Sequence, residues 1–271
     1  MERTSLTNIK NNGLKQTGYT NIALFGLDSR GKNLGKGNRT DTIMIASINN
    51  ETKKVKLISV YRDTMLKQNG EHYDKANAAY SVGGPEMAVN MLNENLDLDI
   101  QDYVSVNFLA LADVIDMVDG ITVKMTDEEV VHMNNYCVET SKVTGKKYKK
   151  IEPAVAGTYK LNGVQAVSYA RIRYTAGGDY KRTERQRLVL EKTANKLKKQ
   201  NLATINKIID KVMPEVSTSF STKEILALAS GAFDFELGKT SGFPFDLETP
   251  DSVPGYSGSY VIPKGLEENV I

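Results

Sequence analysis

The stretch TNIALFGLDSRGKNLGKGNRTDTIMIASINNETKKVKLISVY, residues 20–61, contains three short apolar segments separated by polar residues. Residues 20–27, 41–48 and 54–61 are rich in β-branched and other apolar side chains, and turn-forming residues bound them. This pattern predicts three strands. The connections between them are a Gly-, Asn- and Lys-rich loop and a short Asn-Asn turn, which favour antiparallel neighbours in one sheet.

Charged residues gather at one edge of this predicted sheet. The first strand ends and the second begins at an aspartate, and the antiparallel third strand returns to the same edge. The strand ends and the loop between them therefore supply three acids and three arginines to one place: Asp28, Arg30, Arg39, Asp41, Arg62 and Asp63. The alternative is a polar sheet rim with no chemical role.

Helix and strand patterns alternate along the rest of the chain. The expected helices lie at 85–96, 108–118, 163–168 and about 182–200, with two more within 202–233, the second at 222–232. The expected strands lie at 103–107 and 121–125. Residues 126–150 are polar and are expected to form a surface excursion. The region after residue 234, rich in Gly, Pro and aromatic residues, indicates closing strands. No linker divides the chain, so one domain is expected.

Composition excludes several classes of protein. The chain has 271 residues, 40% of them hydrophobic, and a formal net charge of +2, as in ordinary globular proteins. A single cysteine, Cys137, excludes a disulfide scaffold. The two histidines, His72 and His132, are too few for a zinc site or a histidine-based nucleophile, and no phosphate-binding glycine loop is present. No run of about 18 apolar residues and no signal sequence occurs.

A basic block interrupts this balanced composition. Residues 160–200 contain eleven Lys and Arg against three Asp and Glu, which suggests an anionic partner. The alternative is a solvated, lysine-rich helix face. If residues 171–173 are extended, Arg171 and Arg173 point to the same face. Arginine matches phosphate oxygens with paired donors, and carboxylates with phosphate oxygens suit Mg²⁺. The residues therefore allow phosphoryl transfer, or else a structural network of ion pairs.

Several motifs, in order, resemble the LytR-CpsA-Psr family of bacterial cell-wall enzymes. They cover about residues 20–200 and read NIALFGLDSR (21–30), RTDTIMIASIN (39–49), KLISVYRDT (56–64), DKANAAY (74–80), VNFLALADVIDMVDGITV (106–123), LNGVQAVSYARIR (161–173) and DYKRTERQRLVL (179–190). One position departs from the family pattern, because Tyr61 stands where the family usually has proline. The loss of proline's fixed backbone angle leaves Arg62 and Asp63 in place.

The resemblance implies an α/β fold with a mixed central sheet and helices on both sides. It also implies a Mg²⁺-dependent phosphotransferase that moves a glycopolymer, such as a teichoic acid or capsular polysaccharide, from an undecaprenyl-pyrophosphate carrier to peptidoglycan. Family members are usually anchored by an N-terminal membrane helix and face outward. Residues 1–18 would then be a juxtamembrane segment, and residues 19–271 the extracytoplasmic catalytic domain, in which 201–271 match more loosely.

The resemblance also assigns roles to particular residues. Asp28 and Asp41 match the metal-binding positions, and Arg62, Asp63 and Asp41 the catalytic ones. The pyrophosphate-binding positions are Arg39, Arg62, Lys75, Arg171, Arg173, Arg182, Arg185 and Gln186, and Asn77 lies in the same loop as Lys75. Either Asp41 or Asp63 would accept the proton of the acceptor hydroxyl.

The sequence leaves open where a lipid would bind and which of three functions the chain has. The lipid would need an apolar channel, for which the candidates also suit an ordinary core: Met87, Met91, Leu92, Phe108, Leu109, Leu111, Val114, Ile115 and Val118. Two other functions remain: a pyrophosphatase or phosphodiesterase in which water replaces the acceptor, and a non-catalytic regulator that binds polyanions. No nucleic-acid-binding module is recognisable, and nucleic-acid affinity would fall steeply with salt.

Overall fold

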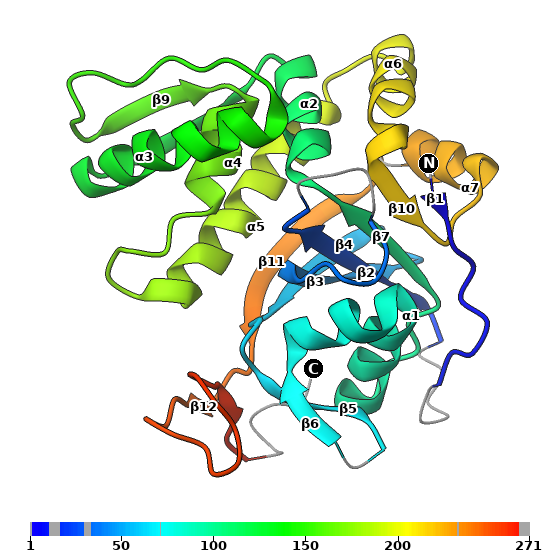
Figure 1. Ribbon diagram of the computed structural model, residues 1–271. Coiled ribbons are helices and arrows are strands. Elements are labelled where there is room, and N and C mark those ends of the chain that lie inside the picture. Colours follow the sequence, from blue (N-terminus) through cyan, green and yellow to red (C-terminus); the bar gives the residue numbers. More distant parts are fainter. Residues whose placement is uncertain (1, 11–16, 30–33, 71, 232, 266–271) are drawn as a thin grey trace. The chain divides into compact units, whose positions relative to one another are not determined.

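The fold is seen in a computed structural model that describes the chain except residues 1, 11–16, 30–33, 71, 232 and 266–271 (Figure 1). Its contacts divide these residues into two compact units. The sheet unit comprises Glu2–Ser105 and Ser217–Ile271, and the helical unit is Val106–Val216 between them. Each unit has a hydrophobic core of its own.

The sheet unit is built on a mixed sheet. Among the described residues its strand order is β1-β10-β7-β2-β3-β4-β11, with β2–β3 and β3–β4 antiparallel and β4–β11 parallel. These strands are β1 (Glu2–Arg3), β2 (Tyr19–Leu27), β3 (Thr40–Asn49), β4 (Lys54–Val60), β7 (Asp102–Val106), β10 (Val216–Thr218) and β11 (Glu236–Phe243). The three strands predicted in residues 20–61 and the closing strand after residue 234 are confirmed.

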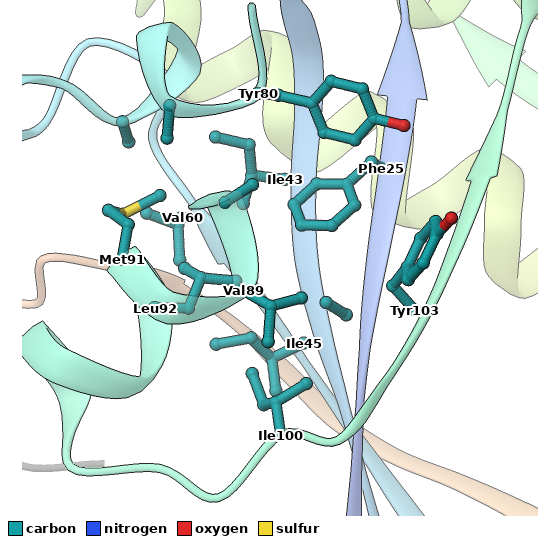
Figure 2. Packing of buried hydrophobic residues seen from close by; sticks show 14 of the residues in the cluster. Phe25, Ile43, Ile45, Val60, Tyr80, Val89, Met91, Leu92, Ile100 and Tyr103 are labelled. Atoms are coloured by element: carbon teal, nitrogen blue, oxygen red, sulfur yellow. The ribbon is translucent and has the colours of Figure 1, made fainter. Parts of the chain in front are cut away.

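Both faces of the sheet are covered, because alternate residues of the central strands point to opposite sides. Phe25, Ile43 and Ile45 pack on one face against α1 (Ala76–Leu96) and its Tyr80 and Leu92 (Figure 2). On the other face, Ile22 and Ile48 belong to a smaller cluster that includes Phe220 and residues of α7 (Thr222–Gly231). The predicted α/β class, with a mixed sheet and helices on both sides, is confirmed.

Helix α1 begins nine residues before the predicted start at Pro85. Gly84 has φ 69° and ψ −161°, so the backbone is not helical there and two helical segments meet at a kink. Pro85 opens the second segment, which is the position where proline's missing N–H costs least. The sequence pattern therefore detected the second segment, while the Gly-Gly break concealed the first.

The remaining strands of the sheet unit form two hairpin-like pairs. β5 (Met65–Asn69) pairs with β6 (His72–Lys75), and β12 (Leu247–Glu248) pairs with β13 (Ile262–Pro263), both antiparallel. In the N-terminal segment, Glu2 and Arg3 pair with β10, and backbone N–H groups at Thr7 and Asn8 donate to the Glu86 carboxylate of α1. This segment is thus attached to the sheet unit. No helix in the described part of the chain has the length and apolar character needed to cross a membrane.

The helical unit packs helices against a two-stranded sheet. Its elements are α2 (Phe108–Met117), β8 (Ile121–Met125), α3 (Asp127–Thr144), β9 (Gly157–Leu161), α4 (Gly163–Ala170), α5 (Gly178–Leu197), α6 (Leu202–Val212) and a 3₁₀ turn at Met213–Glu215. The core contains side chains from β8, α3, α4 and α5, among them Val123, Met133, Tyr169 and Val189. The predicted helices at 108–118, 163–168 and 182–200 correspond to α2, α4 and α5.

The prediction for residues 126–150 is wrong, because most of this stretch is helix α3. Thr126 and Glu129 form a reciprocal capping box at its start, and the buried side chains Val130, Met133 and Cys137 form a narrow stripe at helical spacing. The other buried residues of α3, Asn134, Thr140 and Thr144, are polar, so the average polarity of the segment obscured its buried face. The capping residues were the available signal.

Gly163 fixes the approach of α4 to α2. A Cβ atom at this position would lie 2.2 Å from the carbonyl oxygen of Ala112, a backbone atom that cannot turn aside. We expect Gly163→Ala to lower the free energy of unfolding by about 1–3 kcal/mol, the usual cost of overpacking. Urea unfolding measures the change. Gly231→Ala is the control, because an added Cβ there meets no atom within 4 Å; equal stability of the two variants would contradict this prediction.

Candidate functional site

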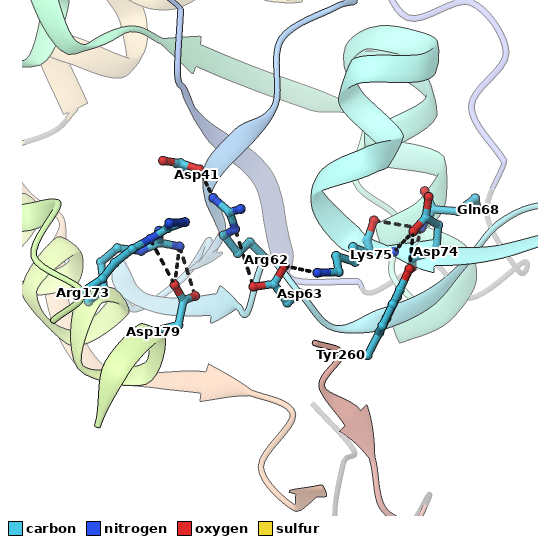
Figure 3. A network of polar contacts seen from close by, with 10 residues as sticks. Asp41, Arg62, Asp63, Gln68, Asp74, Lys75, Arg173, Asp179 and Tyr260 are labelled. Carbon is cyan, nitrogen blue, oxygen red and sulfur yellow. Dashed lines mark hydrogen bonds and ion pairs between the residues drawn. The ribbon is translucent and has the colours of Figure 1, made fainter. Parts of the chain in front are cut away.

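Four predicted site residues meet in a network at one edge of the sheet unit (Figure 3). Arg62, directly after β4, forms an ion pair with Asp41 at the start of β3. Its Nε also lies 3.7 Å from Asp63 Oδ2, and Asp63 Oδ1 lies 3.1 Å from Lys75 Nζ. The four side chains are only 16–25% exposed. A cation therefore stands on each side of Asp63, and Arg62 bridges two carboxylates.

The backbone explains why these residues converge. β3 and β4 are antiparallel, so the end of β4 returns to the start of β3. The chain then turns into β5, and two N–H groups at the start of α1 donate to this turn: Asn77 to the Arg62 carbonyl at 3.0 Å and Ala76 to the Thr64 carbonyl at 2.8 Å. Asn77 is thus a backbone support, and Lys75 precedes the helix as its N-cap residue.

Asp28 and Arg39 lie at the same strand ends. The Asp28 N–H donates to the Arg39 carbonyl at 3.2 Å, where β2 and β3 stop pairing, and both side chains are exposed. Arg30 lies outside the described residues. The predicted convergence of strand ends is therefore observed for the remaining acids and arginines. Within the described residues, no group of three or more acidic, histidine or cysteine side chains is arranged to hold a metal ion.

Tyr61, at the position where the family usually has proline, contacts the backbone of β11. Its N–H donates to the Phe243 carbonyl of β11 at 3.0 Å, a hydrogen bond that proline lacks the proton to make. Its hydroxyl packs on Gly242, where an added Cβ would come within 2.2 Å of it. The departure at Tyr61 thus anchors the end of β4 to β11 and leaves Arg62 and Asp63 at the sheet edge.

The helical unit holds a second group of predicted site residues. Arg171 is the C-cap of α4, with φ −94° and ψ −9°, so it is not extended, and the condition under which Arg171 and Arg173 would share a face is not met. Its guanidinium lies over the rings of Phe108 and Tyr136, with centroid distances of 4.6 and 5.5 Å, and donates to Glu139 at 2.9 Å. Arg171 is therefore fixed by aromatic and acidic neighbours.

Helix α5 carries the other basic residues. Arg185 donates to Glu129 at 2.9 Å, to the Ile172 carbonyl at 3.2 Å and to Thr175 at 2.7 Å. Its side chain is 4% exposed, and that of Arg182, bonded to Asp179, is 2% exposed. Arg185 thus fastens the turn that follows Arg171. Gln186, half-buried, lies next to it on α5.

Arg173 differs from these neighbours in its exposure. Its side chain is 38% exposed, and its Nε lies 3.7 Å from Asp179, which also pairs with Arg182 (Figure 3). Each arginine of the turn and of α5 that was predicted to bind pyrophosphate thus has a carboxylate from its own unit nearby. Arg173 offers the most accessible guanidinium of the four.

Sequence reasoning missed the carboxylates that hold these cations. Asp179 stands three residues before Arg182, a helical spacing that could have identified it. Glu129 belongs to a capping box, which marks a helix start but gives no hint of Arg185. Glu139 meets Arg171 across 32 residues, and Tyr260 meets Asp74 across 186, so neither contact leaves a local signal. Asp74 directly precedes Lys75 and accepts its N–H.

Comparison with known proteins shows how much of the chain matches a known family. The model of the LytR_cpsA_psr family matches residues 2–240. The chain belongs to the LytR-CpsA-Psr family. The resemblance seen in the separated motifs is thereby confirmed, and the match reaches well beyond the 20–200 stretch on which it was based.

Two curated relatives carry different descriptions. Biofilm regulatory protein A of Streptococcus mutans is 33% identical over 210 residues, which are 73% of this chain and 49% of the relative. The polyisoprenyl-teichoic acid–peptidoglycan teichoic acid transferase TagU of Enterococcus faecalis is 31% identical over 211 residues, or 77% of this chain and 64% of that protein. The chain thus spans about half to two thirds of the length of these relatives.

A solved structure of the family shares the fold. It is the LytR-CPS2A-psr family protein YwtF (TagT) with bound octaprenyl pyrophosphate lipid, with a TM-score of 0.65 and 20% sequence identity. The comparison covers 92% of this chain and 85% of that one. At this identity the likeness establishes the fold of the present chain.

The ion pair of Glu129 and Arg185 is expected to contribute to the stability of the helical unit. Glu129→Gln keeps the shape and the capping box but removes the charge that neutralises a guanidinium only 4% exposed. We expect the free energy of unfolding to fall by about 3–5 kcal/mol, as for other broken buried pairs. Glu128→Gln, at a 58% exposed side chain, is the control and should change it by no more than about 0.5 kcal/mol. Equal losses would refute the role of the pair.

Proposed function

We propose that this chain is a transferase that moves a glycopolymer from a polyprenyl-pyrophosphate carrier to peptidoglycan, at the outer face of the bacterial cell membrane. The observation that carries the proposal is the network of Asp41, Arg62, Asp63 and Lys75, which gathers two cations and two carboxylates at one sheet edge. Asp28 lies at a neighbouring strand end. Support comes from the family relative named as a teichoic acid transferase and from the octaprenyl pyrophosphate bound by TagT.

The cations suit the carrier's head group. In this proposal Arg62 and Lys75, in the sheet unit, contact the pyrophosphate oxygens. Arg173 is the most exposed of the predicted arginines of the helical unit and is a separate candidate for binding the anion. Arginine supplies paired donors with a fixed geometry, whereas lysine acts as a compact charge on a flexible stem. Arg171, Arg182 and Arg185 each donate to a carboxylate of the helical unit. Arg185 also donates to the Ile172 carbonyl and so holds the turn that carries Arg173.

The reaction transfers one phosphoryl group together with its glycan. The oxygen of the acceptor hydroxyl attacks the phosphorus that bears the glycopolymer, and its proton passes to the carboxylate of Asp41 or Asp63. The bond between that phosphorus and the bridging oxygen breaks, and polyprenyl phosphate leaves. The product is a glycan joined to the acceptor by a phosphodiester. Arg62, fixed between the two carboxylates, is in place to stabilise charge on the phosphoryl oxygens.

Magnesium fits the donor chemistry of this edge. Asp28 and Asp41 are hard oxygen donors at adjacent strand ends, and Mg²⁺ is commonly held by one or two carboxylates together with substrate phosphate oxygens. These two residues would hold the ion, and bound Mg²⁺ would neutralise negative charge on the pyrophosphate. Asp41 would then be shared between the ion and Arg62, so metal binding would accompany binding of the anion.

Transfer from a labelled lipid-linked glycopolymer to peptidoglycan fragments tests the function. We expect product that depends on the acceptor, and about 10- to 100-fold weaker binding of polyprenyl pyrophosphate by Arg173→Ala, the value of a lost charged hydrogen bond. Lys181→Ala removes the same charge from an exposed side chain on α5 that pairs with Glu184, and should bind normally.

Three outcomes would contradict this proposal. Labelled product released without any acceptor would indicate a hydrolase instead. Equal weakening by Arg173→Ala and Lys181→Ala would indicate unspecific attraction of polyanions. A wild-type protein that bound no polyprenyl pyrophosphate at physiological salt would exclude the lipid carrier as substrate.

The dependence of the metal on the lipid can be measured separately. We expect calorimetry to detect Mg²⁺ binding in the presence of polyprenyl pyrophosphate and little without it, because two carboxylates offer too few ligands for tight binding alone. Asp28→Ala and Asp41→Ala should abolish this binding, while Asp234→Ala, at an exposed residue of the sheet unit, should preserve it. Full transfer activity in excess chelator would overturn the metal assignment.

A further inference from the structure

The C-terminal strap, defined as residues 247–263, lies against the same sheet edge. Its Val261 N–H donates to the Asp63 carbonyl at 2.9 Å, and the Val261 carbonyl accepts from the Met65 N–H at 2.8 Å. These two bonds form a parallel bridge between Val261 and Thr64. The strap is thus attached to the backbone that carries Asp63, in the turn between β4 and β5.

Tyr260 extends this attachment to side chains. It is 5% exposed, and its hydroxyl donates to Asp74 Oδ1 at 3.0 Å (Figure 3). Lys75 Nζ lies 4.9 Å from the centroid of its ring. The same ammonium lies 3.1 Å from Asp63. Lys75 is therefore held by the face of an aromatic ring and by a carboxylate at once.

Asp74 links the ring to the backbone of Lys75. Its Oδ1 accepts the Tyr260 hydroxyl and also the Lys75 N–H at 2.7 Å. Burial of the phenol, together with its hydrogen bond to Asp74, raises the pKa of Tyr260 to about 12. The hydroxyl consequently keeps its proton and remains a donor throughout the neutral range. Tyr256 packs edge-on against the Tyr260 ring, with centroids 5.5 Å apart, and supports its orientation.

A lysine at this place needs such support. Its ammonium is a point charge on a stem with four rotatable carbons, so the free side chain samples many positions. A cation over an aromatic face gains most where water is partly excluded. The ring and Asp63 together restrict Lys75 to one position beside Arg62, before any anion arrives.

We propose that Tyr260 is a positioning residue that holds the Lys75 ammonium beside Asp63 in the pyrophosphate site. The inference rests on the proposed function in so far as it gives Lys75 an anionic ligand to meet. The family match ends at residue 240, so the site would be completed by a segment that lies beyond the matched residues.

The decisive measurement is a double-mutant cycle on affinity for polyprenyl pyrophosphate and on kcat and KM of transfer. We expect Tyr260→Leu to weaken binding of polyprenyl pyrophosphate about tenfold, as loss of a partly desolvated cation–π contact does. Tyr260→Phe keeps the ring and should retain most of the wild-type affinity. In the Lys75→Met background Tyr260→Leu should have no further effect. If the effects of the two substitutions multiply, Tyr260 is only structural and the proposal is overturned.

A second readout needs no ligand. Competitive acylation with mass spectrometry gives the reactivity of the Lys75 amine, which we expect to rise severalfold in Tyr260→Leu and little in Tyr260→Phe. Tyr73→Leu, at an exposed tyrosine two residues from Lys75, is the control and should leave the amine unchanged. Unchanged Lys75 reactivity in Tyr260→Leu overturns the proposal, provided melting curves show the variant to be folded.

The two readouts separate the two claims. If the wild-type protein binds no polyprenyl pyrophosphate, the proposed function fails, and the Lys75 reactivity still decides whether Tyr260 holds the ammonium. If the wild type binds the lipid but Tyr260→Leu binds it equally well, the function stands and the positioning role is overturned.

Discussion

Burial of both faces of β2, β3 and β4 is the constraint on which the rest of the sheet unit depends. Side chains alternate between α1 on one side and the α7 cluster on the other, so a register shift of one residue would move every apolar group to the wrong face. The register in turn fixes where each strand ends. Because those ends carry Asp41, Arg62 and Asp63, hydrophobic packing decides the geometry of a polar network that has no hydrophobic residues in it.

In both units, carboxylates of the same unit lie next to the predicted site arginines and offset their charge. Arg62 stands between two carboxylates in the sheet unit, and Arg171, Arg182 and Arg185 each have an acidic partner in the helical unit. Guanidinium groups fixed in this way lose little freedom when an anion arrives, which is the basis of electrostatic preorganisation. Acids outside the basic block of residues 160–200 pair with some of its cations: Glu139 with Arg171, and Glu129 with Arg185. Asp179, inside the block, pairs with Arg173 and Arg182.

The sequence was sufficient wherever the information is local. Apolar segments bounded by turn residues predicted β2, β3 and β4. The short connections predicted their antiparallel order, and hence the meeting of Asp41 with Arg62. It was insufficient where partners come from distant segments: Glu129 meets Arg185 across 56 residues, and Tyr260 meets Asp74 across 186. The stripe of α3 was hidden by its polar neighbours, and the conformation at Arg171 follows from the end of α4 rather than from its own residue type.

The order of the two units along the chain affects how the sheet can form. Strand β10 pairs beside β7, yet Tyr103 and Ser219, which share a hydrogen bond there, are 116 residues apart. Closing a loop of that length costs entropy before any contact compensates for it. The helical unit, which fills that loop, is built mainly of contacts within itself. If the helical unit becomes compact first, the flexible loop that remains between β7 and β10 consists only of its two connections to that unit. Early collapse of the inserted segment would thus lower the entropy cost of pairing β10 with β7 afterwards.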